Sequence, residues 1–318
     1  MVSPLALFRA LADPTRLRIV ALLRRMELSV GELAQVLGQS QPRVSRHVRI
    51  LTDVGLCGRR REGSWVFLRL GPSASPALFT AIDGWRDSAA EKWELADAAR
   101  LEAVRADRAA AAEAYFNAHA ADWDAIRSLH VAEEQVEAAI AHLLANHPIG
   151  RLVDIGTGTG RMLELLGSDA DSAIGIDRSP EMLRFARARM AAAGIAGADL
   201  RQGDMYALPL DGESADTVVL HLVLHYAEAP AAAVREAARL IAPGGRLLIV
   251  DFAAHEREEL REREGHARLG FDDEQMAGWF VAAGLDPAAT ETLAGGELTV
   301  KIWLGLRRAD DRRLRAAA

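Results

Sequence analysis

Glycines at three alternating positions, Gly156, Gly158 and Gly160, follow the apolar run Leu152–Ile155 and precede a helical pattern. Glycine has no Cβ, so the backbone can turn sharply there and a ligand can approach closely. A strand, a tight loop and a helix N-terminus in this order suit a ligand that carries a nucleoside. The acidic side chain of Asp154, just before the loop, disfavours a phosphate and favours a cationic group. A dinucleotide loop, spaced Gly-x-Gly-x-x-Gly, and a plain structural turn are the alternatives.

Further acidic residues follow the next two predicted strands. Asp177 ends the strand expected at residues 173–177, about twenty residues beyond the glycine loop, where a carboxylate can accept both ribose hydroxyls. Its alternative role is to cap the helix that begins after Ser179. Asp204 and Met205 end the strand expected at residues 200–205.

Strands and helices alternate regularly through residues 151–307, which predicts an α/β fold with a mostly parallel, helix-covered sheet. Residues 216–221 form the fourth predicted strand, and residues 240–251 supply a helix end, a turn and the fifth. Residues 298–306 alternate as an antiparallel strand would. The sequence thus predicts a Rossmann-like sheet that brings the glycine loop and the acidic strand ends together.

These features resemble motif I and the following acidic motifs of class I S-adenosylmethionine (SAM) dependent methyltransferases, over about residues 115–307. The resemblance implies that SAM or S-adenosylhomocysteine is the ligand, with Asp204 bonding the adenine amino group and Met205 packing on the ring. The residues expected to bind the cofactor are Asp154, Gly156, Thr157, Gly158, Gly160, Asp177, Arg178, Asp204, Met205 and His221.

Three polar residues after the fourth strand, His221, His225 and Tyr226, stand where the methyl group should point. His225 and Tyr226 are the catalytic candidates, since either could orient or deprotonate a methyl acceptor. They could equally be satisfied polar groups at a pocket wall. A charge-dense stretch at residues 255–271 is read mainly as solvated helix, placed where methyltransferases of this class insert substrate covers. Neither an Asn-Pro-Pro-Tyr motif nor a set of cysteines is present, which disfavours amide and arsenite acceptors.

The first 71 residues carry twelve arginines and five acidic residues, although the whole chain has a net charge of -7. Such a positive segment attracts polyanions. Asp13 and Pro14 begin a predicted helix, residues 30–38 form a second, and Ser40 is expected to cap a third at residues 41–51. This is the spacing of a DNA-reading helix-turn-helix.

A basic hairpin at residues 57–70 follows as the predicted wing of this motif. The apolar residues of the third helix recur at helical spacing, which leaves its polar residues outward. The residues expected to contact DNA are Ser40, Gln41, Arg43, Ser45, Arg46, His47, Arg49, Arg60 and Arg61.

The N-terminal segment resembles the ArsR/SmtB family of winged-helix repressors over about its first 95 residues, through Asp13–Arg16, Glu32–Ala34 and Ser40–His47. The resemblance implies a homodimer that binds a palindromic double-stranded operator and pairs through its first and last helices. Many members sense metals through a Cys-x-Cys pair, but the corresponding residues 28–33 have no thiol. No metal site is therefore expected.

Four segments are predicted: a winged helix-turn-helix at residues 1–71, dimerisation and connector helices at 72–114, a methyltransferase-like domain at 115–307, and a charged, frayed tail at 308–318. The sparse apolar stripe of the connector suits a seam between two helices better than a core. Residues 115–127 are read either as a core helix or, from the resemblance, as a lid over the ligand.

The chain has no segment that approaches the length of a membrane span and no leader, so a soluble, cytoplasmic protein is expected. Its pattern also resembles proteins that fuse an ArsR-type domain to a methyltransferase domain. The favoured hypothesis is a transcriptional repressor that senses SAM or S-adenosylhomocysteine. The alternative is an active small-molecule methyltransferase with an autoregulatory DNA-binding domain, whereas DNA methylation lacks a base-flipping motif.

Overall fold

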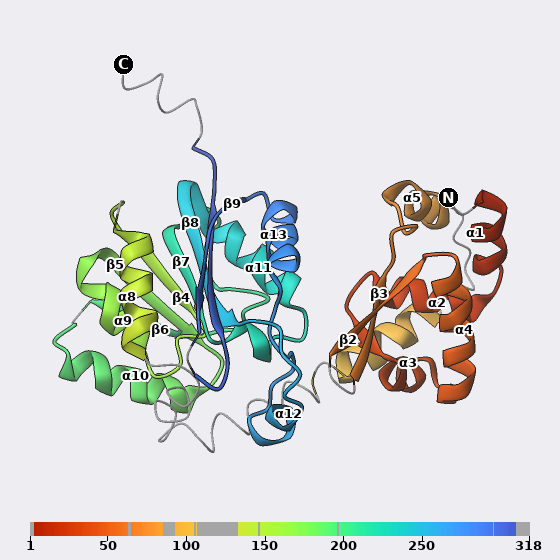
Figure 1. Cartoon of the computed structure of the whole chain (residues 1–318), viewed down its shortest axis with the longest axis horizontal. Helices are drawn as coiled ribbons and strands as arrows, with labels where there is room; N and C mark the ends of the chain where they lie inside the picture. The colour runs from red at the N-terminus through yellow and green to blue at the C-terminus, as the bar shows by residue number, and fades with distance from the viewer. Residues whose placement is uncertain are drawn as a thin grey trace. The chain divides into compact units, whose positions relative to one another are not determined.

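The computed structural model describes residues 3–62, 65–84, 93–104, 106, 133–145, 147–195, 197–294 and 296–309, without the side chains of residues 60–62, 65 and 262. The chain divides into two compact units, residues 1–111 and 112–318 (Figure 1).

The N-terminal unit is a winged helix. Its helices are α1 (Pro4–Leu11), α2 (Pro14–Leu23), α3 (Val30–Leu37) and α4 (Gln41–Asp53), and its strands are β1 (Leu28–Ser29), β2 (Cys57–Glu62) and β3 (Trp65–Leu70). The three strands form an antiparallel sheet in the order β1-β3-β2.

Local signals in the sequence begin and end these helices. The Asp13 carboxylate accepts the Arg16 N–H at the start of α2, and Gly38, with a left-handed φ of 64°, ends α3. Ser40 occupies the cap position of α4, as predicted, but its side chain makes no capping hydrogen bond. Side-chain capping by Ser40 was therefore a wrong prediction. Pro42, the second residue of α4, lacks an N–H and so needs no capping acceptor there.

The connector begins with α5 (Pro76–Gly84), and residues 93–104 form a further helix. Leu101 and Val104 of that helix are buried in the core of the winged-helix unit. The expectation that the connector stripe would serve a two-helix seam rather than a core was therefore wrong for these two residues. Residues 115–127, the predicted lid or core helix, lie outside the described residues.

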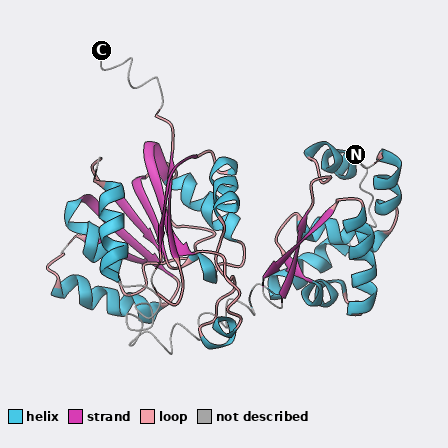
Figure 2. Ribbon diagram, viewed as in Figure 1, coloured by secondary structure: helices cyan, strands magenta, loops and turns pink. Residues whose placement is uncertain are grey.

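The C-terminal unit contains a sheet whose strands are drawn in magenta in Figure 2. Its seven strands lie in the order β6-β5-β4-β7-β8-β10-β9. The strands from β6 to β8 are parallel, and β10 pairs antiparallel with both β8 and β9. The strands are β4 (Gly150–Ile155), β5 (Ala170–Asp177), β6 (Ala198–Gln202), β7 (Ala215–His221), β8 (Ile241–Phe252), β9 (Asp286–Leu293) and β10 (Val300–Leu306). The predicted Rossmann-like sheet is confirmed, while β9 was not foreseen.

Helices cover both faces of this sheet (Figure 1). They are α8 (Glu133–Leu144), α9 (Arg161–Leu166), α10 (Pro180–Ala192), α11 (Pro230–Leu240) and α13 (Asp273–Ala282), while the short α12 (Glu259–Arg263) lies beyond the strand ends (Figure 1). Alternate residues of β7 enter opposite cores: Val218 packs in the cluster with α11 and α13, and Val219 in the cluster with α8 and α9. Because the strands from β6 to β8 are parallel, their carboxyl ends lie at one edge of the sheet, where the candidate site lies.

Candidate functional site

The glycine loop is held against the end of β5 by its own backbone. The N–H groups of Gly156 and Thr157 both donate to the Ile176 carbonyl, at 2.7 and 3.0 Å. Gly156 has a φ of 71°, and a Cβ there would overlap the Val223 side chain. Only glycine fits this position, because it tolerates both the left-handed backbone and the close neighbour.

Asp177 links the glycine loop to the start of α10. Its Oδ2 accepts the Gly158 N–H and its Oδ1 accepts the Ser179 N–H, each at 2.8 Å. Burial raises the pKa of Asp177, and the backbone hydrogen bonds partly oppose this shift. The cap of α10 is Ser179, whose hydroxyl accepts the Met182 N–H at 3.2 Å. Since each carboxylate oxygen has more than one acceptor direction, Asp177 retains capacity for ribose hydroxyls.

Asp154 is buried beneath the loop, at 1% exposure. Its Oδ2 accepts a hydrogen bond from the Thr157 hydroxyl at 2.6 Å, so the carboxylate stabilises the conformation of the glycine loop. Direct contact between Asp154 and a ligand stays a prediction. Arg178 is exposed, and its carbonyl accepts the side-chain amide of Gln202 at 3.0 Å.

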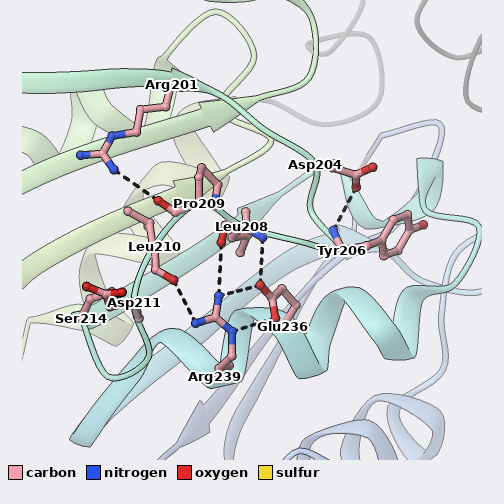
Figure 3. Close-up of polar contacts among 10 residues, drawn as sticks. All are labelled: Arg201, Asp204, Tyr206, Leu208, Pro209, Leu210, Asp211, Ser214, Glu236 and Arg239. Carbon is pink, nitrogen blue, oxygen red and sulfur yellow. Dashed lines mark hydrogen bonds and ion pairs between the residues drawn. The ribbon is translucent and has the colours of Figure 1, made fainter.

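The loop after β6 carries the predicted adenine contacts. Asp204 is exposed, and its carboxylate accepts the Tyr206 N–H at 3.0 Å (Figure 3), while Met205 packs partly against the core. The Tyr206 hydroxyl accepts the N–H groups of Glu228 and Ala229 at 2.8 and 3.1 Å. Burial raises the pKa of the Tyr206 hydroxyl above its ordinary value. Tyr206 thus ties this loop to the segment that precedes α11.

A second anchor for the same loop comes from α11 (Figure 3). Glu236 accepts the Leu208 N–H at 2.9 Å, and Arg239 donates to the Leu210 carbonyl at 2.9 Å and to Glu236 at 2.6 Å. The arginine lowers the pKa of Glu236, which keeps the carboxylate charged. Sequence reasoning missed Tyr206, Glu236 and Arg239, because an acid and an arginine three residues apart on a helix look like an ordinary surface pair.

His225 lies at the carboxyl ends of β7 and β8 in a buried pair with Asp251. Its Nδ1 is 2.8 Å from Asp251 Oδ1, and its backbone N–H donates to Oδ2 at 3.1 Å. The exposed fractions are 2% for His225 and 0% for Asp251. Tyr226 and His221 are half-buried nearby in the chain. Leu222, next to His221, has a left-handed φ of 49°, a strained backbone of the kind found at functional sites.

Two residues of the charge-dense stretch, which the sequence predicts to be mainly solvated helix, pack on this pair. Its helix α12 is short, whereas His266 and Arg268 are 3% and 1% exposed. The His266 ring centroid is 4.3 Å from that of His225, and the Arg268 N–H donates to the His225 carbonyl at 2.8 Å. Burial, and then the proximity of His225, lowers the pKa of His266 to about 3. The prediction of solvated charges is wrong for Arg268, because its guanidinium donates to the carbonyls of residues 227 and 228. Other charged residues of the stretch, Glu256, Glu259 and Arg263, are exposed as predicted.

The predicted DNA-binding face lies mostly on the exposed side of α4. Val44, Val48 and Leu51 are fully buried, and His47 is half-buried with Nδ1 3.7 Å from Asp13 Oδ1. His47 therefore turns toward α2 rather than outward. The side chains of Arg60 and Arg61, on β2, lie outside the described residues. The exposed predicted contacts are Ser40, Gln41, Arg43, Ser45, Arg46 and Arg49.

Comparison with known proteins decides the family of the N-terminal unit. The family model "Bacterial regulatory protein, arsR family" matches residues 13–57. The arsenical resistance operon repressor of Escherichia coli K12 is 46% identical over 85 residues, which are 26% of this chain and 73% of that protein. The chain belongs to the ArsR family. A second ArsR relative, an arsenic resistance transcriptional regulator of Pseudomonas putida, is 39% identical over 102 residues, 32% of this chain and 79% of that protein.

A "Methyltransferase domain" family model matches residues 153–249 of this ArsR-family chain. The malonyl-[acyl-carrier protein] O-methyltransferase of Methylococcus capsulatus is 34% identical over 149 residues, 46% of this chain and 53% of that enzyme, so the chain spans about half of its length. A SAM-dependent methyltransferase structure from Thermotoga maritima shares the fold, with a TM-score of 0.51, 23% identity and coverage of 62% of this chain and 99% of that one.

The chain thus joins an ArsR-type DNA-binding regulator domain to a methyltransferase domain. Within the part of the chain that the structure describes, no group of three or more His, Cys, Asp or Glu residues could hold a metal ion. None of the described helices combines the length and apolar character that a membrane crossing requires.

Proposed function

We propose that this protein is a DNA-binding transcriptional repressor whose methyltransferase domain binds SAM or S-adenosylhomocysteine and couples that ligand to operator affinity. The observation that carries the proposal is Asp177, whose carboxylate joins the glycine loop to the start of α10 in a chain with an ArsR-type domain. A nucleoside site in the same chain as this domain would give the regulator a means of responding to the nucleoside.

The residues around the glycine loop fit a cationic nucleoside ligand. Asp177 and Asp204 place carboxylates after neighbouring strands β5 and β6, and Gly156 leaves room where a Cβ would collide with Val223. Carboxylates at this edge suit ribose hydroxyls and the positive charges of SAM. The bound sulfonium would supply a methyl group to an acceptor, whereas the chain's own residues hold the ligand.

Burial of His225, a catalytic candidate at the carboxyl ends of β7 and β8, favours ligand sensing over catalytic turnover. His225 is 2% exposed, and its polar groups pair with Asp251 and Arg268. A general base must lie within hydrogen-bond reach of the proton it removes. In this arrangement the imidazole is enclosed by Tyr226, Phe252 and His266, whose ring centroids lie 4.1, 4.8 and 4.3 Å from its own.

The regulator acts as a homodimer in this proposal. Leu5 and Phe8 of α1 are 59% and 50% exposed, and Leu95 of the last described N-terminal helix is 75% exposed. Apolar side chains at such positions are available to a second copy of the chain. A ligand that binds two dimer geometries with different affinities shifts the population of the geometry that fits an operator.

Active methylation of a small molecule is the second candidate function, and the His225–Asp251 pair is the observation that favours it. The carboxylate accepts the Nδ1 proton, which leaves Nε2 as the basic nitrogen. Movement of the segment around His266 would then have to expose that nitrogen to an acceptor hydroxyl, thiol or amine.

Operator binding tests the favoured function. Operator duplexes are first selected from a random pool by the purified protein. The affinity of the protein for a selected duplex is then measured by fluorescence anisotropy, without ligand and with saturating SAM or S-adenosylhomocysteine. We expect one ligand to change the operator affinity at least tenfold, about 1.4 kcal/mol of coupling, and Asp177→Ala to abolish the change. Equal operator affinity with and without ligands that demonstrably bind contradicts sensing. Catalytic release of S-adenosylhomocysteine in cell extract would instead support the enzyme.

A further inference from the structure

The helix of residues 93–104 belongs to the N-terminal unit, which ends at residue 111, and one of its residues makes a shielded ion pair. Asp97 is 3% exposed and accepts two hydrogen bonds from Arg18 of α2. Arg18 Nε lies 2.7 Å from Oδ2, and Nη2 lies 2.6 Å from Oδ1. A bidentate arginine–carboxylate pair fixes orientation as well as distance. The pair therefore sets how this helix lies on α2.

The same cluster reaches the C-terminal end of α3. Arg18 Nη2 also donates to the Leu37 carbonyl at 3.4 Å, and Arg100 Nη1 donates to the Val36 carbonyl at 3.2 Å. Carbonyl groups in the last turn of a helix lack intrahelical donors, and cations stabilise them. Arg100 Nη1 is also 3.9 Å from Asp97 Oδ1. We call Asp97, Arg18 and Arg100 the clasp, because they join helix 93–104 to the end of α3.

The end of α3 determines where the DNA-reading helix lies. Only residues 38–40 separate α3 from α4. Leu101 and Val104, about one and two turns beyond Asp97, are buried in the same core as Val44 and Val48 of α4. A shift of helix 93–104 is therefore transmitted both through a three-residue turn and through shared packing.

We propose that Asp97 is a positioning residue for operator binding, through which the clasp transmits ligand occupancy of the methyltransferase domain to α4. The proposal rests on the proposed sensor function and names the contact that would regulate it. A shielded ion pair suits this role because separating its partners leaves each charge uncompensated. Partly separated arrangements are therefore unfavourable, and the contact is either made or broken. Such a contact can separate two discrete arrangements rather than yield gradually.

A neighbouring ion pair offers a matched control. Arg24, also on α2, pairs with Asp83 of α5, with Nη1–Oδ1 and Nη2–Oδ2 distances of 2.9 and 3.0 Å. The Arg24 and Asp83 side chains are 32% and 38% exposed, compared with 16% and 4% for Arg18 and Asp97. Asp83→Asn thus removes a bidentate pair from the same helix without touching the clasp.

The experiment compares Asp97→Asn, Arg18→Gln, the double variant and Asp83→Asn in the full chain. Operator affinity is measured with and without saturating S-adenosylhomocysteine, and ligand affinity is measured by calorimetry without DNA. We expect the ligand effect on operator affinity to fall from at least tenfold to less than twofold in both clasp variants. The double variant should resemble the single ones, as expected for residues of one contact. Ligand affinity should stay within twofold, and Asp83→Asn should keep the full effect.

Hydrogen exchange gives a readout that a purely structural role would not move. S-adenosylhomocysteine should alter exchange at residues 36–44 in the wild type and leave it unchanged in Asp97→Asn. A folded Asp97→Asn protein that keeps the full wild-type ligand effect overturns the proposal. If Asp97→Asn does not fold, Arg100→Gln carries the same test, because the Arg100 side chain is 52% exposed.

Failure of the sensor function would look different. The wild type would then bind S-adenosylhomocysteine with no change in operator affinity. In that case Asp97→Asn must still increase exchange at residues 36–44 and weaken operator binding without ligand, since the clasp would position α4 regardless. Unchanged exchange and unchanged operator binding would overturn the clasp as well.

Discussion

Replacing His266 with phenylalanine should remove the part of the domain's loss of stability at acidic pH that arises from one buried imidazole. The pKa of His266 is lowered from 6.5 to about 3, first by burial and then by the proximity of His225. The unfolded chain takes up a proton below pH 6.5, but the folded chain does not. This contribution to stability is therefore complete above pH 6.5 and is lost as the pH falls toward 3.

The size of the effect follows from the two pKa values. One pKa unit corresponds to about 1.4 kcal/mol, so at pH 5 the wild type should have lost about 2 kcal/mol of unfolding free energy through His266 alone. Phenylalanine cannot take up the proton and keeps an aromatic ring against Phe252, whose ring is stacked on His266 with centroids 5.7 Å apart. The variant should lose correspondingly less stability between pH 8 and pH 5.

The assay is urea unfolding at pH 8 and pH 5, followed by hydrogen exchange of peptides from β7 and β8. Variant and wild type are compared at the same pH, so intrinsic exchange rates cancel. His142→Gln is the control, because His142 lies exposed on α8. If His266→Phe and wild type lose equal stability between the two pH values, burial of a neutral imidazole is not the cause and the reasoning is refuted.

Other substitutions test the ligand site, the DNA face and the buried pair. Asp177→Asn should weaken S-adenosylhomocysteine binding at least tenfold, as measured by calorimetry, because hydrogen bonds to charged groups contribute about 1.5–3 kcal/mol. Asp199→Asn, at an exposed position of β6, should leave the binding affinity unchanged. Arg46→Ala should lower operator affinity and reduce the slope of log K against log salt by about one, with Arg25→Ala as the basic control; an unchanged slope would remove Arg46 from the interface. Asp251→Ala leaves three buried donors without their acceptor and should destabilise the methyltransferase unit by about 3 kcal/mol or more, while operator binding persists; stability within 1 kcal/mol would contradict the pairing.

The fold could be predicted from sequence because its signals are local. The glycine loop, the cap at Asp13 and the glycine that ends α3 are fixed by backbone requirements of the residues concerned. The continuous apolar run of β7 is explained by burial of alternate side chains on the two faces of a parallel sheet. The strand β9 was missed because its residues, including Pro287, give no apolar alternation.

The buried polar contacts could not be predicted, because they depend on pairs far apart in the chain. His225 meets Asp251 from the next strand of the sheet, and Arg18 meets Asp97 across 79 residues. A charged residue such as Arg268 is predicted to be solvated unless the carbonyl groups that accept its hydrogen bonds are known. The sequence therefore predicted the glycine loop but not the long-range contacts that support it.

The central claim, that ligand and operator binding are coupled, is tested most directly from the ligand side. Calorimetry gives the affinity of the full chain for S-adenosylhomocysteine and for SAM, with saturating selected operator and with a scrambled duplex of equal length. Because coupling is reciprocal, one ligand should bind at least tenfold more tightly or more weakly when the operator is present, by the same factor found for DNA. Identical ligand affinities with operator and with scrambled DNA would contradict the account.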